Sequence, residues 1–448
     1  MLSELKIQNF KTWEKVYLEF RPITGLFGAN SSGKSSLIQF LLLLKQTKEA
    51  TDRGIALNFT GRFANVGSFR DVIYRHEENR GLWWSLEFNL EDDLVLQDPS
   101  TKRTAALVKS DQFAVESSVE QGSLGAVSTS LSYHVGRQTF SLVRKSNEKT
   151  AFDLQAEGSA FRFIRTPGRA WQLPGPTKAY AFPDQARTYY QNASLLADLE
   201  ATYEKQIDNI YYLGPLREHP KREYVWSRTR PVDVGLAGEK TIDAILAATA
   251  DSEKFNLVHR GKLKSFQEIV AHWLKEMGLI SSFTIREIAK GSGYFQALVK
   301  VKPHSPEALL TDVGFGVSQV LPIIVLLYYV PEDSTVILEQ PEIHLHPLAQ
   351  SALADLFINV AERRNIQIIF ESHSEHLLLR IQRRIAEDEL DADDVILHSA
   401  SYRDGESVLE ELNVDDLGQI SNWPENFMGD AFGETLAAER ARLKRLSK

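Results

Sequence analysis

The sequence contains no cysteine, and this absence removes several kinds of chemistry at once. No disulfide framework, thiolate metal site or cysteine nucleophile is available to the chain. Long apolar runs are also missing, because the longest, Phe40–Leu44 and Val320–Val330, fall short of the roughly 20 residues of a membrane span. The N-terminal stretch MLSELKIQNF lacks the charged-then-apolar pattern of a signal peptide. We therefore expect a cytoplasmic protein of bacterial type, with no membrane partner.

An excess of basic residues is missing as well. The 448 residues include 51 lysines and arginines against 60 aspartates and glutamates, which gives a formal net charge of −9. This balance argues against a general nucleic-acid coat but leaves room for a local basic groove, so DNA stays open as a partner. With 43% hydrophobic residues the chain can build real cores, and its length predicts two or three domains.

The most informative stretch that is present runs from Gly28 to Ser35 and matches the phosphate-binding pattern G-x-x-x-x-G-K-[ST]. Residues 23–27 predict a short buried strand before it, and residues 35–45 predict a helix after it. This context argues against the alternative, a chance Gly/Ser-rich turn. The glycines let successive N–H groups wrap around phosphates, and the helix N-terminus adds a favourable dipole.

Within this loop, Lys34 is expected to reach the β- and γ-phosphates of ATP, and Ser35 is expected to bind Mg²⁺. The full set of residues predicted to bind the nucleotide here is Gly28, Ala29, Asn30, Ser31, Ser32, Gly33, Lys34, Ser35 and Ser36.

Strands and helices alternate in the last third of the chain, which predicts an α/β fold with a parallel sheet. Strands are expected there at 335–339, 366–370, 395–398 and 407–412, and helices at 347–363 and 376–386. Elsewhere the patterns predict strands at 2–7, 16–20 and 209–213, a β-rich region at about 82–182, helices at 186–210 and 239–279, and a hairpin of 283–288 with 295–301. We expect both ends of the chain to build one sheet, with the middle inserted.

Two strand ends in this last third carry residues suited to ATP chemistry. The apolar strand 336–339 ends in Glu339, at the place where a second acidic motif of P-loop ATPases holds Mg²⁺. The segment Gln340–Pro347 follows it directly. The next apolar strand, at 368–370, leads into Glu371-Ser372-His373.

A second anion-binding surface is predicted upstream. Gly314, Gly316, Ser318 and Gln319 precede an apolar helix at 320–328. One chain has little use for two such surfaces. Two chains would have a use for both surfaces if each presented its second surface to the nucleotide bound by the other.

With these motifs in this order, the chain resembles the ABC-type ATPases of the SMC/RecF/OLD-like class. Within it, the chain is similar to small bacterial ATPases that share E-Q-P-E-[IL]-H-L-H-P and E-S-H-S-E-H motifs and a C-terminal domain of unknown function. The resemblance covers about residues 1–75 and 205–430. Residues 212–217 and Trp423-Pro424 also look like the family, but their sequence suggests no role.

The resemblance implies roles for the motif residues. Lys34 and Ser35 would bind phosphate and Mg²⁺, and Glu339 would support the metal. His373 would contact the γ-phosphate or the attacking water. The signature motif, Gly314–Gln319, would meet the γ-phosphate bound on a partner subunit.

The fold class that the resemblance implies is α/β, an ABC-type ATPase head with a mixed or parallel sheet and a middle that is β-rich and helical. The domains expected on this basis are 1–81 as the N-terminal part of the head, 82–185 as a β-rich insertion or lobe, 186–280 as a helical region, 281–412 as the C-terminal part of the head, and 413–448 as a tail helix.

One departure from the family matters for catalysis. Where most ABC ATPases place a carboxylate that orients water, this chain has Gln340, and glutamine cannot accept a proton. Three interpretations follow: a naturally slow ATPase that uses ATP as a dimerising switch, a displaced base such as Glu342 or Glu371, or an engineered substitution. The predicted catalytic set is Glu339, Gln340, Glu342 and His373, with intact ATP binding and slow hydrolysis.

Three features have alternative interpretations. Histidines at 344, 346, 373 and 376 suggest a metal site, although a loop at a subunit interface explains them better. The acidic residues at 391, 393, 394, 415 and 416 suggest a nuclease centre, although a solvated loop is favoured. Aromatic residues of the middle region suggest a base-stacking surface, although a sheet core explains them more simply.

The favoured function is a nucleotide-gated homodimer that regulates an effector in trans, for example a nuclease, in bacterial anti-phage defence. The alternative is an ATPase of DNA repair or DNA processing, or a self-contained nuclease, that acts directly on DNA. A regulatory module with a structural ATP site is a further alternative.

Overall fold

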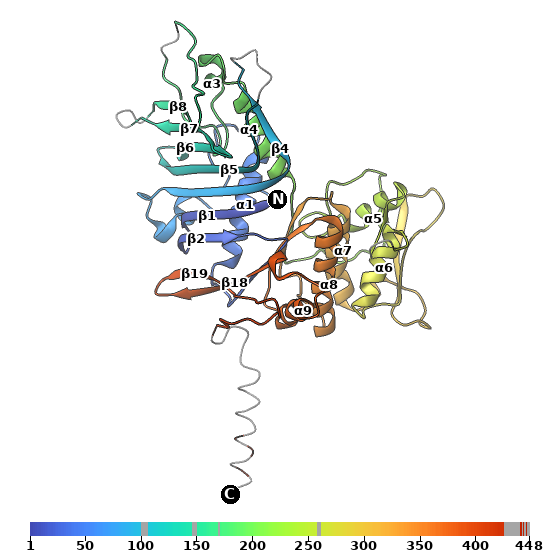
Figure 1. Cartoon of the computed structure of the whole chain (residues 1–448). Helices are drawn as coiled ribbons and strands as arrows, with labels where there is room; N and C mark the ends of the chain where they lie inside the picture. The colour runs from blue at the N-terminus through green and yellow to red at the C-terminus, as the bar shows by residue number, and fades with distance from the viewer. Residues whose placement is uncertain are drawn as a thin grey trace.

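The computed structural model describes residues 1–99, 106–145, 150–168, 171–257 and 261–424, together with Arg440, Arg442 and Arg445. Two large β-sheets dominate this part of the chain (Figure 1). No helix in it is long and apolar enough to cross a membrane.

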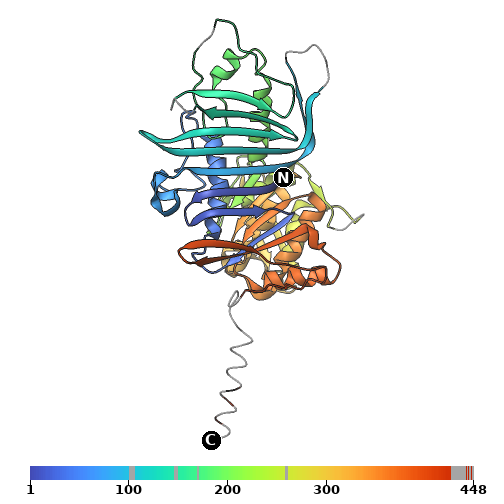
Figure 2. The same cartoon turned by 60° about the vertical axis from the view of Figure 1, so that its left-hand side comes forward.

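The larger sheet has seven antiparallel strands within the described ranges, in the order β2-β1-β4-β5-β6-β7-β8. They are β1 (Leu2–Phe10), β2 (Trp13–Glu19), β4 (Leu82–Gln97), β5 (Ala106–Gly122), β6 (Gly125–Val135), β7 (Gln138–Arg144) and β8 (Phe152–Glu157). Figure 2 shows these blue to teal strands stacked one above another, with the red hairpin of the second sheet beside β2. Apolar residues alternate along them, as a half-buried antiparallel sheet requires.

Within the described residues, the second large sheet has six strands and combines strands from both ends of the chain, as expected, with one strand from the middle, β9. Its order is β19-β18-β3-β17-β16-β9, and every neighbouring pair is parallel except β18 with β19. The strands are β3 (Ile23–Gly28), β9 (Ile210–Leu213), β16 (Thr335–Glu339), β17 (Gln367–Glu371), β18 (Val395–Arg403) and β19 (Glu406–Glu411). The fold is therefore α/β with a mixed sheet.

Helices cover both faces of this second sheet (Figure 1). The described helices are α1 (Lys34–Glu49), α2 (Phe69–Val72), α3 (Asp184–Tyr189), α4 (Leu195–Asp208), α5 (Thr241–Ala250), α6 (Phe266–Glu276), α7 (Phe315–Tyr329), α8 (Pro347–Arg364) and α9 (Glu375–Ala386), with short 3₁₀ turns η1 (Tyr74–His76), η2 (Leu310–Asp312) and η3 (Ala392–Asp394). Small strands complete the structure: β10 (Tyr224–Val225), β13 (Ser282–Glu287), β14 (Tyr294–Lys300) and β15 (Ala308–Leu309) form one sheet, and β11 (Lys254–Phe255) pairs with β12 (Lys264–Ser265).

The second sheet separates two hydrophobic cores. Ile337 of β16 and Ile369 of β17 face a core that contains α1, α4 and the seven-stranded sheet. Their neighbours Leu338 and Phe370 face the other core, which contains α5 to α9. Because successive strand residues point to opposite faces, this alternation places α1 and α7 on opposite sides of the sheet.

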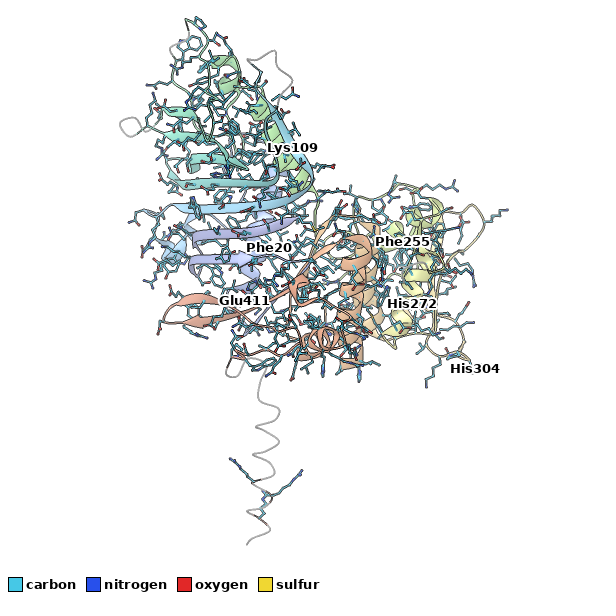
Figure 3. The ribbon with its side chains drawn as sticks, in the orientation of Figure 1. Phe20, Lys109, Phe255, His272, His304 and Glu411 are labelled. Atoms are coloured by element: carbon cyan, nitrogen blue, oxygen red, sulfur yellow. The ribbon has the colours of Figure 1, made fainter. Side chains whose placement is uncertain are left out.

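Aromatic contacts hold the helical side together. Phe255, labelled in Figure 3, packs edge-on against Phe266 of α6 and Tyr328 of α7, with ring centroids 5.7 and 5.6 Å apart. Trp273 of α6 donates a hydrogen bond to the Tyr328 hydroxyl at 3.0 Å. These contacts fix α6 against α7, the helix that begins at the predicted signature motif.

The expected domain boundaries do not follow the sheets. Strand β4 pairs with β1, so β4 to β8, which lie in the region expected as a β-rich insertion or lobe, extend the N-terminal sheet. The region 186–280 is also divided: α4 packs in one core, α5 and α6 pack in the other, and β9 lies in the second sheet. Sequence periodicity identifies such segments but does not show which sheet or core takes them.

The tail helix expected at 413–448 is wrong for residues 413–424. That segment is a turn closed by a β-bridge between Val414 and Ile420, with Asp415 accepting hydrogen bonds from two following N–H groups. A side chain that bonds its own loop in this way competes with helix formation. Apart from the three helical arginines at 440, 442 and 445, the rest of the tail lies outside the described residues.

The aromatic residues of the middle region mostly fill the core. Trp84, Phe88, Tyr133 and Phe140 are each at most 1% exposed. This supports the sheet-core interpretation over a base-stacking surface for these four residues.

Gln367 ties the two large sheets together. Its buried amide accepts from Leu2 N–H (3.0 Å) and from the Thr335 hydroxyl (2.9 Å), and it donates to the Leu2 carbonyl at 2.8 Å. Gln367→Ala would leave the Leu2 backbone groups buried without partners. We expect it to lower the free energy of unfolding by about 2–4 kcal/mol, measured in urea. The matched control is Gln121→Ala on an exposed strand end, which should change stability little.

Candidate functional site

The P-loop forms the turn between β3 and α1, as predicted. Gly28 and Gly33 have positive φ angles of 130° and 99°. A Cβ on Gly28 would lie 2.1 Å from the Ala400 carbonyl oxygen of β18, and one on Gly33 would lie 2.7 Å from the Ser407 hydroxyl. Both positions therefore require glycine for conformation and for space.

Lys34 and Ser35 lie at the start of α1, and both contact the carboxylate of Glu371. The Lys34 ammonium donates to the carbonyls of Gly28 (3.0 Å) and Ala29 (2.8 Å) and lies 3.8 Å from Glu371. The Ser35 hydroxyl donates to the other oxygen of Glu371 at 2.7 Å. Burial lowers the pKa of Lys34, while Glu371 and Glu342 oppose that shift.

Glu339 lies beside Glu371 because their strands are paired in register. It accepts a hydrogen bond from the Tyr212 hydroxyl at 2.9 Å, and Tyr212 belongs to the next strand, β9. Burial raises the pKa of Glu339 to about 7, and the nearby charge of Glu371 adds to the increase. Arg217, which follows β9, partly counters the increase in that pKa.

Of the remaining predicted catalytic residues, Gln340 and Glu342 lie in the loop after β16, and His373 follows β17. Gln340 has a φ of 44° and its N–H donates to the Glu371 carbonyl at 2.8 Å. Glu342 is buried and accepts from the His373 N–H at 2.7 Å, and burial raises its pKa. Burial and the Lys34 charge lower the pKa of His373, which favours a neutral imidazole.

The signature residues lie at the start of α7, against the loop that follows β16: a Cβ on Gly316 would lie 3.4 Å from the His344 carbonyl oxygen. Gly314 is the N-cap of α7, and Gly316, Ser318 and Gln319 lie in the first turn of the helix, which starts five residues earlier than predicted. Phe315 is 42% exposed. The centroid of its ring lies 5.2 Å from that of His344 and 5.3 Å from that of His219. Helices α7 and α1 lie on opposite faces of the sheet, so different cores support the signature residues and the P-loop.

The alternative sites receive no support from the described residues. No group of three or more His, Asp or Glu side chains among them is placed to hold a metal. His346 is instead the N-cap of α8, and His344 packs against Phe315.

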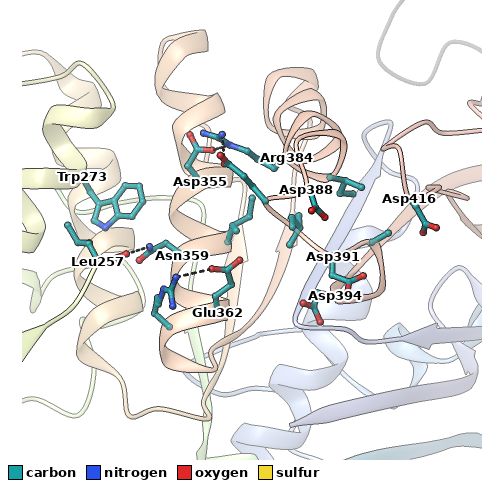
Figure 4. A pocket seen from close by; sticks show the side chains of 16 residues that line it. Leu257, Trp273, Asp355, Asn359, Glu362, Arg384, Asp388, Asp391, Asp394 and Asp416 are labelled. Atoms are coloured by element: carbon teal, nitrogen blue, oxygen red, sulfur yellow. Dashed lines mark hydrogen bonds and ion pairs between the residues drawn. The ribbon is translucent and has the colours of Figure 1, made fainter. Parts of the chain in front are cut away.

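The acidic residues after α9 line a cavity of about 890 Å³ far from the P-loop in sequence (Figure 4). Asp388, Asp391, Asp394 and Asp416 are spread along its wall, and Asp355 is paired with Arg384 at 2.7 Å. Asp415 is occupied by its own loop. This arrangement fits a solvated acidic surface.

The residues present fit Mg²⁺ and a nucleotide. Ser35, Glu339 and Glu371 supply hard oxygen donors, the type that Mg²⁺ prefers, and few protein ligands suffice when phosphates and waters complete the shell. Lys34 and the positive end of α1 supply the charge for phosphates. When bound, the metal would neutralise charge on the phosphates.

Two segments of the chain that contribute residues to this site match ATPase families. Residues 1–158 match an AAA ATPase domain, and residues 201–380 match a family described as "AAA domain, putative AbiEii toxin, Type IV TA system". Residues 390–437 match a family of unknown function, DUF3696. The P-loop lies in the first segment, and the signature residues, Glu339 and His373 lie in the second. A comparison with curated proteins found no match.

Solved SMC head domains resemble the chain over most of its length. An SMC head bound to the C-terminal winged-helix domain of ScpA is 14% identical over 93% of this chain and 98% of that one, with a TM-score of 0.46. The SMC head domain of Thermotoga maritima is 12% identical over 92% and 99%, with a TM-score of 0.42. The head from Pyrococcus furiosus bound to the C-terminal domain of ScpA is 13% identical over 92% and 96%, with a TM-score of 0.43. With scores below 0.5, these likenesses carry none of the functional argument.

Sequence reasoning missed several residues of the site. It treated Glu371 only as a substitute base, whereas Glu371 touches both Lys34 and Ser35. Trp13 of β2, which donates to the Ser36 hydroxyl at 2.9 Å, was not foreseen. The signal for Tyr212 and Arg217 was present in residues 212–217, but their role depends on β9 lying beside β16.

The raised pKa of Glu339 predicts a pH-dependent stability. Between about pH 4.5 and 7 the unfolded chain loses this proton while the folded, nucleotide-free chain keeps it, so stability falls as pH rises through that window. Glu339→Gln should therefore raise the free energy of unfolding at pH 8 by on the order of 1–3 kcal/mol and have little effect at pH 5. Thermal and urea unfolding without nucleotide would measure this. Glu223→Gln, an exposed carboxylate, is the control, and an equal gain at both pH values would contradict the assignment.

Proposed function

We propose that the protein is a nucleotide-gated homodimeric ATPase. ATP on the P-loop of one copy would be completed by the signature residues of a second copy, giving two composite sites. Hydrolysis would be slow, and the joined state would be the signal that an effector reads.

The observation that supports this proposal is the placement of the P-loop and of the signature helix relative to the second sheet. The P-loop and the signature helix have cores on opposite faces of one sheet. Gly314 lies in open space, with nothing within 4 Å of a Cβ built on it, at the N-terminus of a fifteen-residue helix. A helix N-terminus of this kind favours an anion, and the anion it can meet is the nucleotide of another copy.

Slow hydrolysis follows from Gln340. The side chain next to Glu339 is an amide, Glu371 accepts from the Ser35 hydroxyl, and one oxygen of Glu342 accepts from the His373 N–H. We therefore expect turnover below about one ATP per second, against a median near 10 s⁻¹ for enzymes.

An effector in trans and a role in anti-phage defence are further parts of the proposal. Their support is the resemblance of the motifs to small bacterial ATPases of the OLD-like group. The match of residues 201–380 to a family described with a type IV toxin–antitoxin system is consistent with a partner of this kind.

The first test uses Gly314→Asp. Its φ of −56° suits any residue, and aspartate is a favourable N-cap, so the fold should tolerate it. Its charge would repel the partner's phosphate. We expect ATP and Mg²⁺ to convert the wild type from monomer to dimer in size-exclusion chromatography with light scattering, while Gly314→Asp binds ATP and stays monomeric.

Two further variants sharpen this test. Gly314→Ser, a neutral N-cap, should dimerise, and Lys34→Ala should neither bind ATP nor dimerise. A mixture of Lys34→Ala with Gly314→Asp contains one intact composite site and should recover heterodimers. A wild type that stays monomeric with ATP, or a Gly314→Asp variant that dimerises as well as the wild type, would overturn the proposal.

The second test restores a carboxylate beside Glu339. Gln340→Glu should raise ATP turnover about 10–100-fold, since a positioned general base contributes at least that much. Steady-state phosphate release measures it, with Gln340→Asn as a control that should remain slow. Unchanged turnover in Gln340→Glu would place the base elsewhere, at Glu342 or Glu371.

A further inference from the structure

Arg217 lies in the loop that follows β9, beside the carboxylate expected to hold Mg²⁺. Its Nε and Nη1 atoms are buried and have no hydrogen-bond partner. Burial lowers its pKa to about 10, and the groups that counter this are Tyr212 and Glu339. The guanidinium therefore lies near Glu339, and two of its nitrogens, Nε and Nη1, have no partner.

Buried donors without partners are costly and rare in folded proteins. An arginine fork also has the geometry that recognises phosphate oxygens. The two buried nitrogens of Arg217 therefore point to an anionic ligand.

The position of Arg217 relative to the sheet favours a nucleotide phosphate as that anion. Strands β3, β17, β16 and β9 are parallel, so the P-loop, Glu371, Glu339 and the loop with Arg217 all follow the carboxyl ends of adjacent strands. Glu339 is a buried carboxylate suited to a cation, and Arg217 is a buried cation suited to an anion. A magnesium nucleotide supplies both.

We propose that Arg217 is a further nucleotide-binding residue, which donates to an oxygen of the terminal phosphate of ATP on the P-loop of the same chain. The identity of the nucleotide rests on the proposed function. Because ADP lacks this phosphate, Arg217 would make the site distinguish ATP from ADP.

The test compares ATP and ADP binding, each with Mg²⁺, by calorimetry on dilute protein. In Arg217→Met we expect ATP affinity to fall about tenfold or more and ADP affinity to change less than twofold, because a charged hydrogen bond to phosphate is lost only with ATP. Arg217→Lys, which keeps the charge without the fork, should fall between. The control is Arg286→Met, an exposed arginine of β13 paired with Glu307, which should leave both affinities unchanged.

Thermal melting of the nucleotide-free variants distinguishes a loss of nucleotide binding from a loss of stability. Methionine replaces a buried, unpartnered cation with an apolar chain of similar size, so Arg217→Met should melt at or above the wild-type temperature. A lower melting temperature together with equal losses of ATP and ADP affinity would show a structural role and overturn the proposal. An unchanged ATP-to-ADP affinity ratio in both Arg217→Met and Arg217→Lys would also overturn it.

The outcome of this experiment does not depend on whether the proposed dimer forms. Nucleotide binding is measured below the concentration at which copies associate, whereas dimerisation is measured at high concentration. A wild type that never dimerises would contradict the composite site and leave the ATP-to-ADP comparison as a valid test of Arg217.

Discussion

The parallel pairing of β17 between β3 and β16 is the constraint on which the site depends. It sets Glu371 in register with Glu339 on one side and beside the end of β3 on the other. From there Glu371 reaches both Lys34 and Ser35. Three segments far apart in the sequence thus meet at one sheet edge, where parallel strands of α/β proteins commonly bind ligands.

The same sheet also separates the helix that follows the P-loop from the helix that begins at the predicted signature motif. Its strands are apolar on both faces, so each face carries its own core and its own helices. Helix α1 and the P-loop belong to one face, and α7 with the signature residues belongs to the other. In the proposed function, this division would make a second copy part of the site, so that ATP binding would join two copies.

The loop after β9 lies near Glu339 and also contacts the signature helix. It carries Arg217 near Glu339, and two residues later His219 packs against Phe315 of the signature helix. Phe315 in turn contacts His344 in the loop that follows Glu339. Ring contacts of Phe315 therefore link the start of α7 to the loop after β9 and to the loop after β16.

The sequence by itself determined the P-loop, the acidic strand end at Glu339 and the α/β alternation of the last third. Each is a local pattern of glycine placement, apolar runs and charge at a strand end, so the chain encodes it within a few residues. Only the tertiary structure decided that Glu371 touches Ser35, that β4 extends the N-terminal sheet, and that the loop with Arg217 follows the strand paired with that of Glu339. These depend on which strands become neighbours, and strand order is set by the packing of the two cores, which local periodicity does not contain.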